Sequence, residues 1–297
     1  MIQYLYLGRV DYGEALRMQE ELVALRIADR IGNVLLLLEH PPVLTLGRNA
    51  TRANILASDE FLAARGVTVH EINRGGDVTY HGPGQLIGYP IFDLRSLRNP
   101  SGGNRLGPVD FVRLMEEALI RLCGEFGVQA GRICGLTGVW CGLDQPRLSS
   151  KGAQCAEPRP GAAPTQSAGR KIAAIGIHVA RGVTSHGFAF NVTTDLRDFA
   201  LINPCGITDR PVTSLEREVA DPSSLPRLES LAPMAAREFG LVFDEPVAHV
   251  ESLAALRALV VAAPDLPVAE FPAQDTPLQI PPEIERLRHA KDRPVSA

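Results

Sequence analysis

The chain has 297 residues, enough to bury the core of one large α/β domain or of two modest ones without disulfide or metal staples. Its 30 Lys and Arg residues and 34 Asp and Glu residues give a formal net charge of −4, which lacks the basic excess that a nucleic-acid-binding surface needs. No apolar run approaches the roughly 18 residues that span a bilayer, and the first residues lack the basic start of a signal peptide, so we expect a cytoplasmic protein with no membrane partner.

The first half of the chain alternates helix and strand patterns. Asp11 and Glu14 have the spacing of a helix-capping box, and apolar residues follow at three- and four-residue steps, which predicts an amphipathic helix. Nearly continuous apolar runs then predict strands that are buried on both faces. The expected strands lie at residues 34–38, 43–46, 67–72 and 86–92, and a second helix lies at residues 111–126. This order indicates an α/β (α+β) fold.

The second half of the chain contains an insertion, a hairpin and an extension. Residues 143–169 are rich in Pro, Gly, Ser and Ala without periodicity, which predicts a flexible insertion. Two strands, at residues 172–179 and 183–192, are expected to form a hairpin directly after it. Beyond residue 245 the chain turns Ala- and Pro-rich. We therefore expect one domain at residues 1–245 and a partly disordered extension at residues 246–297.

The segment at residues 73–85 is the densest in unusual residues. It combines four glycines and a proline with Arg74, Tyr80, His81 and Gln85. Glycines let a backbone approach a ligand closely with its amide groups exposed, so this composition favours a binding loop. It lacks the GxxxxGK[ST] order of a phosphate-binding loop. The alternative is an elaborate turn in which His81 caps a neighbouring strand.

A second candidate for chemistry is Cys205, which lies between a proline and a glycine. A thiol becomes a nucleophile when its thiolate is populated, which requires a nearby cation, histidine or helix N-terminus. The candidates for this role are Lys171, His81, His178 and His186. In isolation such a cysteine is more often a buried apolar side chain, and a lysine at a strand start is usually just solvated.

The remaining cysteines suggest no site. They lie at positions 123, 134, 141 and 155, with neither a CxxC pair nor the spacing of a zinc site. We expect the cysteines to be free thiols in a reducing compartment, and we expect no metal and no bound cofactor.

Three segments carry a resemblance to a known family. They are Arg-Gly-Gly-Asp-Val-Thr-Tyr-His-Gly-Pro-Gly-Gln at residues 74–85, Gly-Arg-Lys-Ile-Ala-Ala-Ile-Gly at residues 169–176 and Asn-Pro-Cys-Gly at residues 203–206. In them, and at residues 39–47, the chain resembles the octanoyltransferase family of lipoate biosynthesis. The resemblance covers about residues 1–240. It implies a mixed β-sheet flanked by helices, similar to the catalytic domain of biotin and lipoate protein ligases.

The resemblance also implies roles for individual residues. Cys205 would be the nucleophile that forms an acyl thioester. Lys171 would be the cation that lowers the pKa of Cys205 and later takes part in the proton transfer of the acceptor amine. Small residues would leave room for an acyl chain, and backbone amides would offer an oxyanion site. The residues implied to bind substrate are Arg74, Gly75, Gly76, Asp77, Val78, Thr79, Tyr80, His81, Ala174, Ile175, Gly176, Gly187, Phe188 and Ala189.

The implied reaction moves an octanoyl or lipoyl group from acyl carrier protein to a lysine of a lipoyl-domain protein. Acceptors of this kind are the lipoyl domains of 2-oxoacid dehydrogenase E2 subunits and the glycine cleavage H protein. One alternative is an ATP-dependent lipoate or biotin protein ligase of the same fold, although such an enzyme needs no thiol. The other is a non-catalytic module that binds an acyl carrier, with Cys205 merely buried.

Overall fold

The computed structural model describes residues 1–99, 102, 105–143, 169–203 and 210–261. The strands are β1 Ile2–Arg9, β2 Asn33–Glu39, β3 Val43–Leu46, β4 Thr68–Glu71, β5 Val78–His81, β6 Gln85–Ile91, β7 Ala130–Ile133, β8 Leu136–Cys141, β9 Arg170–Ala180, β10 Val183–Asn191 and β11 Val247–His249. The helices are α1 Tyr12–Ile27, α2 Asp59–Ala64, α3 Pro108–Gly124, α4 Leu215–Glu218, α5 Leu228–Phe243 and α6 Leu253–Ala258. Short 3₁₀ helices are η1 Arg52–Asn54, η2 Leu196–Leu201 and η4 Pro222–Ser224.

A large mixed sheet forms the centre of the described residues, with eight strands in the order β11-β1-β2-β6-β10-β9-β8-β7. The pairs of β1 with β11 and β2 are parallel, and the other pairs are antiparallel. Residues 34–38 are fully buried at the middle of this sheet, as expected from their continuous apolarity. The mixed sheet flanked by helices confirms the predicted fold class.

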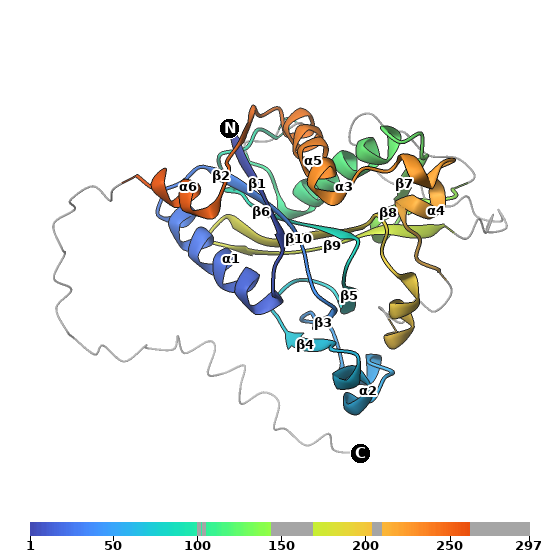
Figure 1. Ribbon diagram of the computed structural model, residues 1–297. Helices are drawn as coiled ribbons and strands as arrows, with labels where there is room; N and C mark the ends of the chain where they lie inside the picture. The colour runs from blue at the N-terminus through green and yellow to red at the C-terminus, as the bar shows by residue number, and fades with distance from the viewer. Residues whose placement is uncertain (100–101, 103–104, 144–168, 204–209, 262–297) are drawn as a thin grey trace, which may run out of the picture. The chain divides into compact units, whose positions relative to one another are not determined.

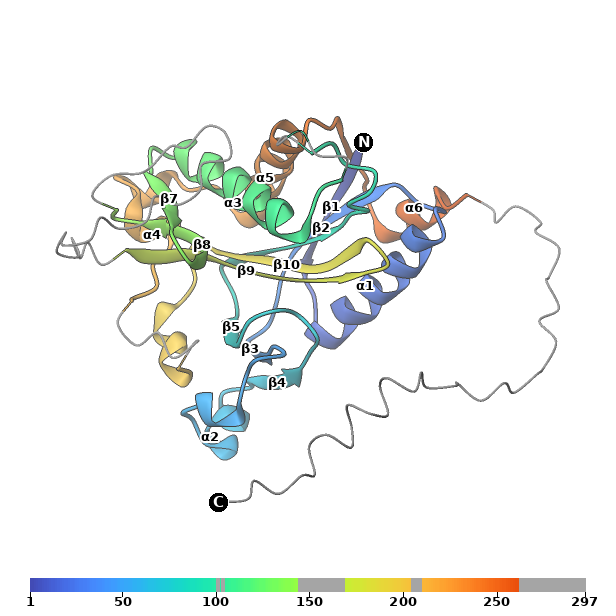
Figure 2. The same ribbon diagram turned by 180° about the vertical axis from the view of Figure 1, so that it is seen from behind.

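Helices cover both faces of the large sheet (Figure 1 and Figure 2). α3 and α5 pack together on one face, over a core that includes Phe111, Phe188 and Phe239. α1 and α6 lie on the other face, over Leu22, Leu36 and the neighbouring apolar residues. α1 begins where expected, since Asp11 caps it by accepting hydrogen bonds from the amides of the first turn at 2.9 and 3.2 Å.

A second sheet of three strands, in the order β4-β3-β5, lies beside the α1 face. It changes the interpretation of the glycine-rich segment. Residues 78–81 form the strand β5, with Thr79 opposite Thr45 and with Val78 and Tyr80 buried in the core of this small sheet. Successive side chains of residues 78–81 point to opposite faces of the small sheet, as in any strand. Only residues 73–77 and 82–84 of the segment are therefore loop.

The compact unit that the structure describes extends to Val261, beyond the expected boundary at residue 245. β11 adds to the large sheet by pairing with β1, and Leu256 of α6 is fully buried. Residues 247–261 therefore pack as part of this unit. The predicted insertion lies almost entirely outside the described residues, as does the extension from residue 262 onward.

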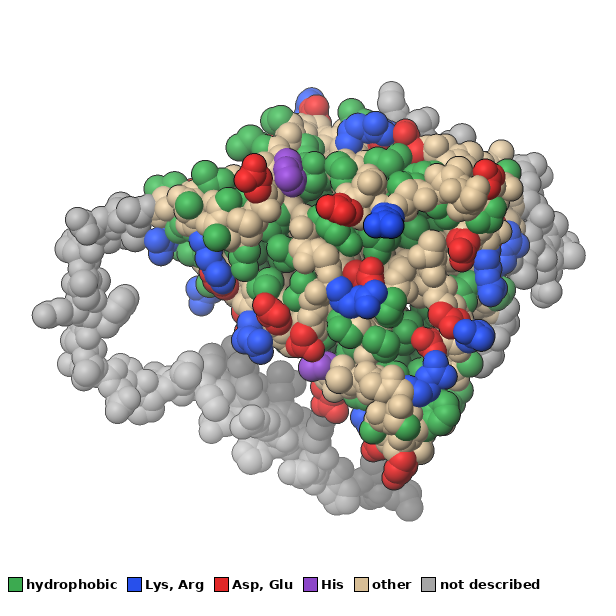
Figure 3. Space-filling view, in the orientation of Figure 1, with side chains coloured by type: hydrophobic (Ala, Val, Ile, Leu, Met, Phe, Trp, Pro, Cys, Tyr) green, Lys and Arg blue, Asp and Glu red, His purple; other side chains and the backbone are tan. Residues whose placement is uncertain are grey.

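The described cysteines differ in state. Cys123 and Cys141 are free and buried, whereas Cys134 is disulfide-bonded, so the expectation of free thiols throughout was wrong at that position. On the face shown in Figure 3, basic and acidic side chains are interspersed rather than segregated. None of the described helices is long and apolar enough to cross a membrane.

Candidate active site

Arg74 fixes the start of the glycine-rich segment against β3. Its buried guanidinium group donates hydrogen bonds to the carbonyl oxygen of Thr45 at 2.8 Å and to Thr45 Oγ1 at 3.0 Å. A further donor, Nη1, reaches the carbonyl oxygen of Gly75 at 3.0 Å. The amide of Arg48 donates to the carbonyl oxygen of Arg74, also at 3.0 Å. Arg74 therefore holds the loop at residues 73–77 in one conformation, and its guanidinium group is engaged with protein acceptors.

Glycines allow this loop to lie directly on β9. The amide of Gly75 donates to the carbonyl oxygen of Ile177 at 3.0 Å. A Cβ at Gly176 would lie 2.7 Å from the carbonyl oxygen of Gly75, which is closer than real Cβ contacts. Gly76 has a φ of 93°, a conformation that other residues rarely adopt. These glycines serve close backbone packing, and the Gly75 amide is used within the protein.

The two strand segments implied to bind substrate, residues 174–176 and 187–189, are brought together as antiparallel partners. Ala174 faces Ala189, and the pairing continues through Ile175 and Phe188 to Gly176 and Gly187. The central pair belongs to the core under α3 and α5, where the Phe188 ring stacks on that of Phe239 at 5.4 Å. Ile175 and Phe188 therefore pack in the interior, on the face away from the glycine-rich loop.

Asp77 and Tyr80 both anchor the chain that leads toward the cysteine motif. The carboxylate of Asp77 accepts hydrogen bonds from Asn54 Nδ2 at 2.9 and 2.7 Å, and the carbonyl oxygen of Asn54 accepts from the amide of Asn203 at 2.8 Å. The hydroxyl of Tyr80 donates to Asp198 Oδ2 at 2.6 Å. Burial and this carboxylate raise the pKa of Tyr80, which keeps it a neutral donor.

His81 is a buried neutral imidazole. Burial, reinforced by neighbouring His40, lowers its pKa to about 3. Its Nδ1 lies 2.9 Å from Gln85 Oε1, and because the amide nitrogen of Gln85 donates to Asn191 Oδ1 at 2.8 Å, the histidine must be the donor in the first bond. Its Nε2 lies 3.5 Å from Thr45 Oγ1 and is left as an acceptor.

This hydrogen-bond chain continues to the strand that carries Lys171. Asn191 Nδ2 donates to the carbonyl oxygen of Thr213 at 2.9 Å, and the amide of Thr213 donates to the carbonyl oxygen of Lys171 at 2.9 Å. In each of these hydrogen bonds the donor lies on the side of the glycine-rich segment, so His81 donates to Gln85 and Gln85 donates to Asn191. The structure thus connects the two regions that the sequence singled out, through buried polar side chains.

Lys171 lies near the start of β9, between β8 and residues 211–213. Its amide donates to the carbonyl oxygen of Pro211 at 2.9 Å, so residues 211–213 take the place beside Lys171 that β10 holds further along the strand. Its Nζ lies 4.7 Å from the centre of the Trp140 ring, within the range of a cation–π interaction. The lysine is therefore held on an aromatic surface and is not simply solvated.

Cys205 lies outside the described residues, so its distance from Lys171 is not part of the structure. The ends of the segment that contains it are described. Asn203 is tied to Asn54 and hence to Asp77, and Pro211 is tied to Lys171. Both ends of this segment are therefore held by the elements predicted to form the site.

Two of the candidate activators are unsuited to stabilise a thiolate at neutral pH, since His81 and His186 are both buried and neutral. Burial and the charge of Arg74 lower the pKa of His186 to about 4, and its Nε2 lies 2.8 Å from Asn73 Oδ1. The free cysteines are equally inert. Burial, with a contribution from Glu218, raises the pKa of Cys141 to about 12, and burial also raises that of Cys123.

The sequence did not single out several residues at this site. Asn191 and Thr213 complete the buried chain, and Trp140 lies under Lys171. Trp140 and Lys171 become cross-strand partners because β9 has one extra residue between the pairs Val139–Ala173 and Trp140–Lys171, a β-bulge. No residue pattern within either strand signals this bulge.

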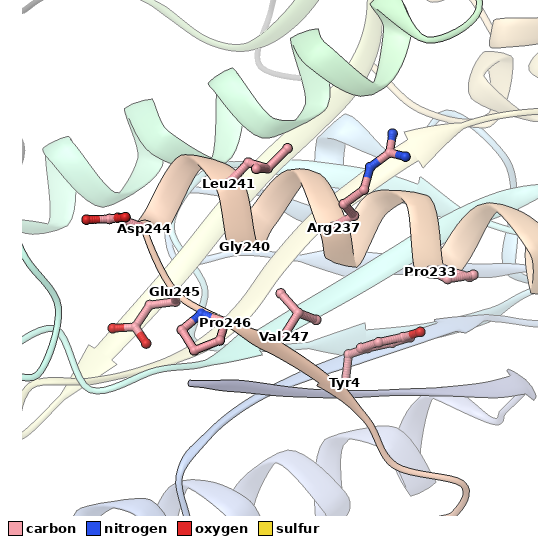
Figure 4. A pocket seen from close by; sticks show the side chains of 9 residues that line it. All are labelled: Tyr4, Pro233, Arg237, Gly240, Leu241, Asp244, Glu245, Pro246 and Val247. Atoms are coloured by element: carbon pink, nitrogen blue, oxygen red, sulfur yellow. The ribbon is translucent and has the colours of Figure 1, made fainter.

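An open cavity of about 580 Å³ lies between α5 and the strands β1 and β11 at one end of the large sheet (Figure 4). Tyr4 and Val247 form its apolar floor, and Arg237 lies at its side. None of the described residues predicted to bind substrate lines it. The cavity is therefore separate from the candidate active site.

Comparison with known proteins gives close relatives over most of the chain. Residues 11–233 match the family described as the lipoyl protein ligase A/B catalytic domain. The chain is 57% identical over 252 residues to the octanoyltransferase of Acidobacterium capsulatum, covering 85% of this chain and 94% of that protein. It is 48% identical over 287 residues to the octanoyltransferase of Koribacter versatilis, covering 97% of each. The second similarity therefore includes most of residues 246–297.

Solved structures with the same fold are more distant in sequence. The bi-partite lipoate protein ligase of Thermoplasma acidophilum superimposes with a TM-score of 0.58 at 15% identity, covering 88% of this chain and 91% of that chain. A lipoate-protein ligase A bound with ATP gives a TM-score of 0.52 at 14% identity, covering 88% and 93%. These similarities establish the fold.

Proposed function

This chain belongs to the family of lipoyl protein ligase A/B catalytic domains and, within it, to the octanoyltransferases of lipoate biosynthesis, and we propose that it transfers an octanoyl group through a thioester on Cys205 with the help of Lys171. The observation that best supports this assignment is the fixed position of the partly buried Lys171. Lys171 is fixed on Trp140 by its side chain and between β8 and residues 211–213 by its backbone, next to one end of the segment that contains Cys205.

The first step would load the enzyme. The Cys205 thiolate attacks the carbonyl carbon of an octanoyl thioester on acyl carrier protein, and the carrier leaves as a thiolate that takes up a proton from the Lys171 ammonium group. The donor thioester is already activated, so this step consumes no ATP. Covalent catalysis of this kind divides one difficult transfer into two easier ones.

The second step would acylate the acceptor. A lysine amine of a lipoyl domain attacks the Cys205 thioester, the new amide bond forms, and the cysteine leaves as a thiolate. The amine must lose a proton during this step, and Lys171, which is neutral after the first step, is the group proposed to accept it. Lipoyl domains of 2-oxoacid dehydrogenase E2 subunits and the glycine cleavage H protein are the proposed acceptors.

Intact-protein mass spectrometry tests the assignment. After mixing with octanoyl-acyl carrier protein and no ATP, the wild-type chain should gain the mass of one octanoyl group, and adding a lipoyl domain should remove it. Cys205→Ala should gain nothing, while Cys123→Ala, a matched control at a buried free thiol, should be loaded as in the wild type. Transfer by Cys205→Ala would refute the thioester. Loading from free octanoate that requires ATP would instead identify a ligase.

A further inference from the structure

We propose that Trp140 is a positioning residue for the transfer, whose indole face holds the ammonium group of Lys171 in place. This inference rests on the role proposed for Lys171. The two residues are directly opposite across the β8–β9 pair, and Nζ of Lys171 lies 4.7 Å from the ring centre. Trp140 is 1% exposed and Lys171 is partly buried, so the contact is partly shielded from water, and cation–π attraction strengthens as water is removed.

The polar edge of Trp140 does not explain its place in the fold. Its indole N–H is buried and has no hydrogen-bond acceptor among the described residues. Buried tryptophans usually find an acceptor for this group, because leaving it unpaired costs free energy. The polar contact that Trp140 does make at this position is between its ring face and the Lys171 ammonium group.

The hairpin that carries Trp140 is held close to Lys171 by its own backbone. Gly138 has a φ of 123°, and a Cβ there would lie 2.6 Å from the carbonyl oxygen of Ala173 and 3.4 Å from Cε of Lys171. Its amide donates to Glu116 Oε1 at 3.0 Å, and this carboxylate is fully buried in α3. The backbone that leads to Trp140 is thus held by α3 through Glu116 and lies directly against β9.

A second cation lies near the same ring. The guanidinium carbon of Arg210 is 5.9 Å from the ring centre, at the described end of the segment that follows Cys205. Arginine keeps its charge throughout the accessible pH range, whereas lysine can lose its proton. Changes of the indole environment with pH therefore separate the two cations.

The indole face favours the charged ammonium over the neutral amine and restricts where it lies. Without the ring, the ammonium would be less well placed to stabilise a thiolate, so the thiol would ionise at higher pH. The energy of a cation–π contact corresponds to a shift of about 0.5–1 pH unit.

Alkylation by iodoacetamide measures this shift. Rates are followed as a function of pH, and the rate of Cys205→Ala is subtracted. Trp140→Leu should raise the midpoint by about 0.5–1 pH unit, and Trp140→Phe, which keeps an aromatic face, should raise it less. Val139→Ala, at the neighbouring fully buried position of β8, controls for loosening of the hairpin and should leave the midpoint unchanged. Equal midpoints in Trp140→Leu and Val139→Ala would overturn the proposal.

The fluorescence of Trp140 gives a second readout, because the chain contains a single tryptophan. Its emission should titrate as the Lys171 ammonium loses its proton, and this transition should disappear in Lys171→Met and persist in Arg210→Met. A transition that survives Lys171→Met would also overturn the proposal. The emission does not depend on Cys205, so failure of the thioester mechanism and failure of the Trp140 contact are separate outcomes.

Discussion

Lys171 is the only lysine in the described part of the chain, since the other two, at positions 151 and 291, lie outside it. The ion pairs among the described side chains are made by arginine instead, as in the bidentate contact of Arg170 with Glu218 at 2.8 Å for each bond. Arginine does not lose its proton in proteins, whereas lysine can. The presence of lysine rather than arginine at position 171 supports the proposal that this cation also acts in proton transfer.

Two substitutions of Lys171 separate charge from proton transfer. Lys171→Arg keeps a cation on Trp140, so Cys205 should still be alkylated and loaded with octanoyl near the wild-type rate. Its transfer to the acceptor amine should fall by about 100-fold or more, the usual contribution of acid–base catalysis. Lys171→Met should slow both steps. Single-turnover experiments measure the loading step and the transfer step separately. An equal loss of loading in Lys171→Arg and Lys171→Met would contradict the separation of charge from proton transfer.

The buried link between Gln85 and Asn191 makes a second prediction at this scale. Each side chain leaves a partner unsatisfied when it is removed, so Gln85→Ala and Asn191→Ala should each reduce the free energy of unfolding by about 1–3 kcal/mol. Because the two side chains share the 2.8 Å hydrogen bond, the losses should not add in the double variant, with a coupling of about 0.5 kcal/mol or more. Urea denaturation of the four proteins completes the cycle. Additive losses would mean that the bond is absent in solution.

At the scale of elements, the β7–β8 hairpin reaches β9 only because residue 138 is glycine. Gly138→Ala should push the hairpin off β9, since the new Cβ would lie 2.6 Å from a backbone oxygen, and should destabilise the fold by about 2–4 kcal/mol. Gly135→Ala is the matched control in the same hairpin, with a φ of 77° and open space around it, and should cost about 1 kcal/mol. Denaturant midpoints compare them, and equal losses would show that backbone strain alone matters.

Elements were predictable from sequence where the strand-like pattern is long. The strand at residues 34–38 follows from its continuous apolarity, and the hairpin of β9 and β10 follows from two strand-like segments joined by a short turn. β5 was hidden within the glycine-rich segment, because glycines on either side of a four-residue strand outweigh its alternation. Residues 211–213 beside Lys171 could not be foreseen either, since a contact between segments 40 residues apart in the chain depends on tertiary packing.

The same division applies to the candidate site. The sequence correctly brought residues 174–176 and 187–189 into one hairpin. It did not distinguish a glycine with open space beside it from a glycine whose side-chain position is occupied by neighbouring backbone. Gly176 is of the second kind, because the carbonyl oxygen of Gly75 occupies that position. That distinction depends on a loop from another part of the chain, so only the folded structure supplies it. The roles of Lys171 and Cys205 in catalysis stay predictions.

For the whole molecule, three buried histidines link catalytic architecture to stability. His40 has a pKa lowered to about 4 by burial, and it donates through Nδ1 to the carbonyl oxygen of Val10 at 2.7 Å while Tyr89 donates to its Nε2 at 2.7 Å. His81 and His186 likewise have pKa values of about 3 and about 4. All three stay neutral in the folded protein at pH values where an unfolded histidine, with a pKa near 6.5, becomes charged.

The free energy of unfolding should therefore fall as pH decreases from about 6.5 to about 4, because the unfolded chain binds more protons in this range. Each histidine contributes a slope of up to about 1.4 kcal/mol per pH unit. His186→Gln keeps a donor for Asn73 and removes one titrating group, so it should reduce the total slope by about a third. His249→Gln, at an exposed position of β11, is the matched control for the loss of a histidine side chain. Urea denaturation at pH 7, 6 and 5 measures the slopes, and an identical slope in His186→Gln would mean that His186 is already protonated in the folded state or accessible to water.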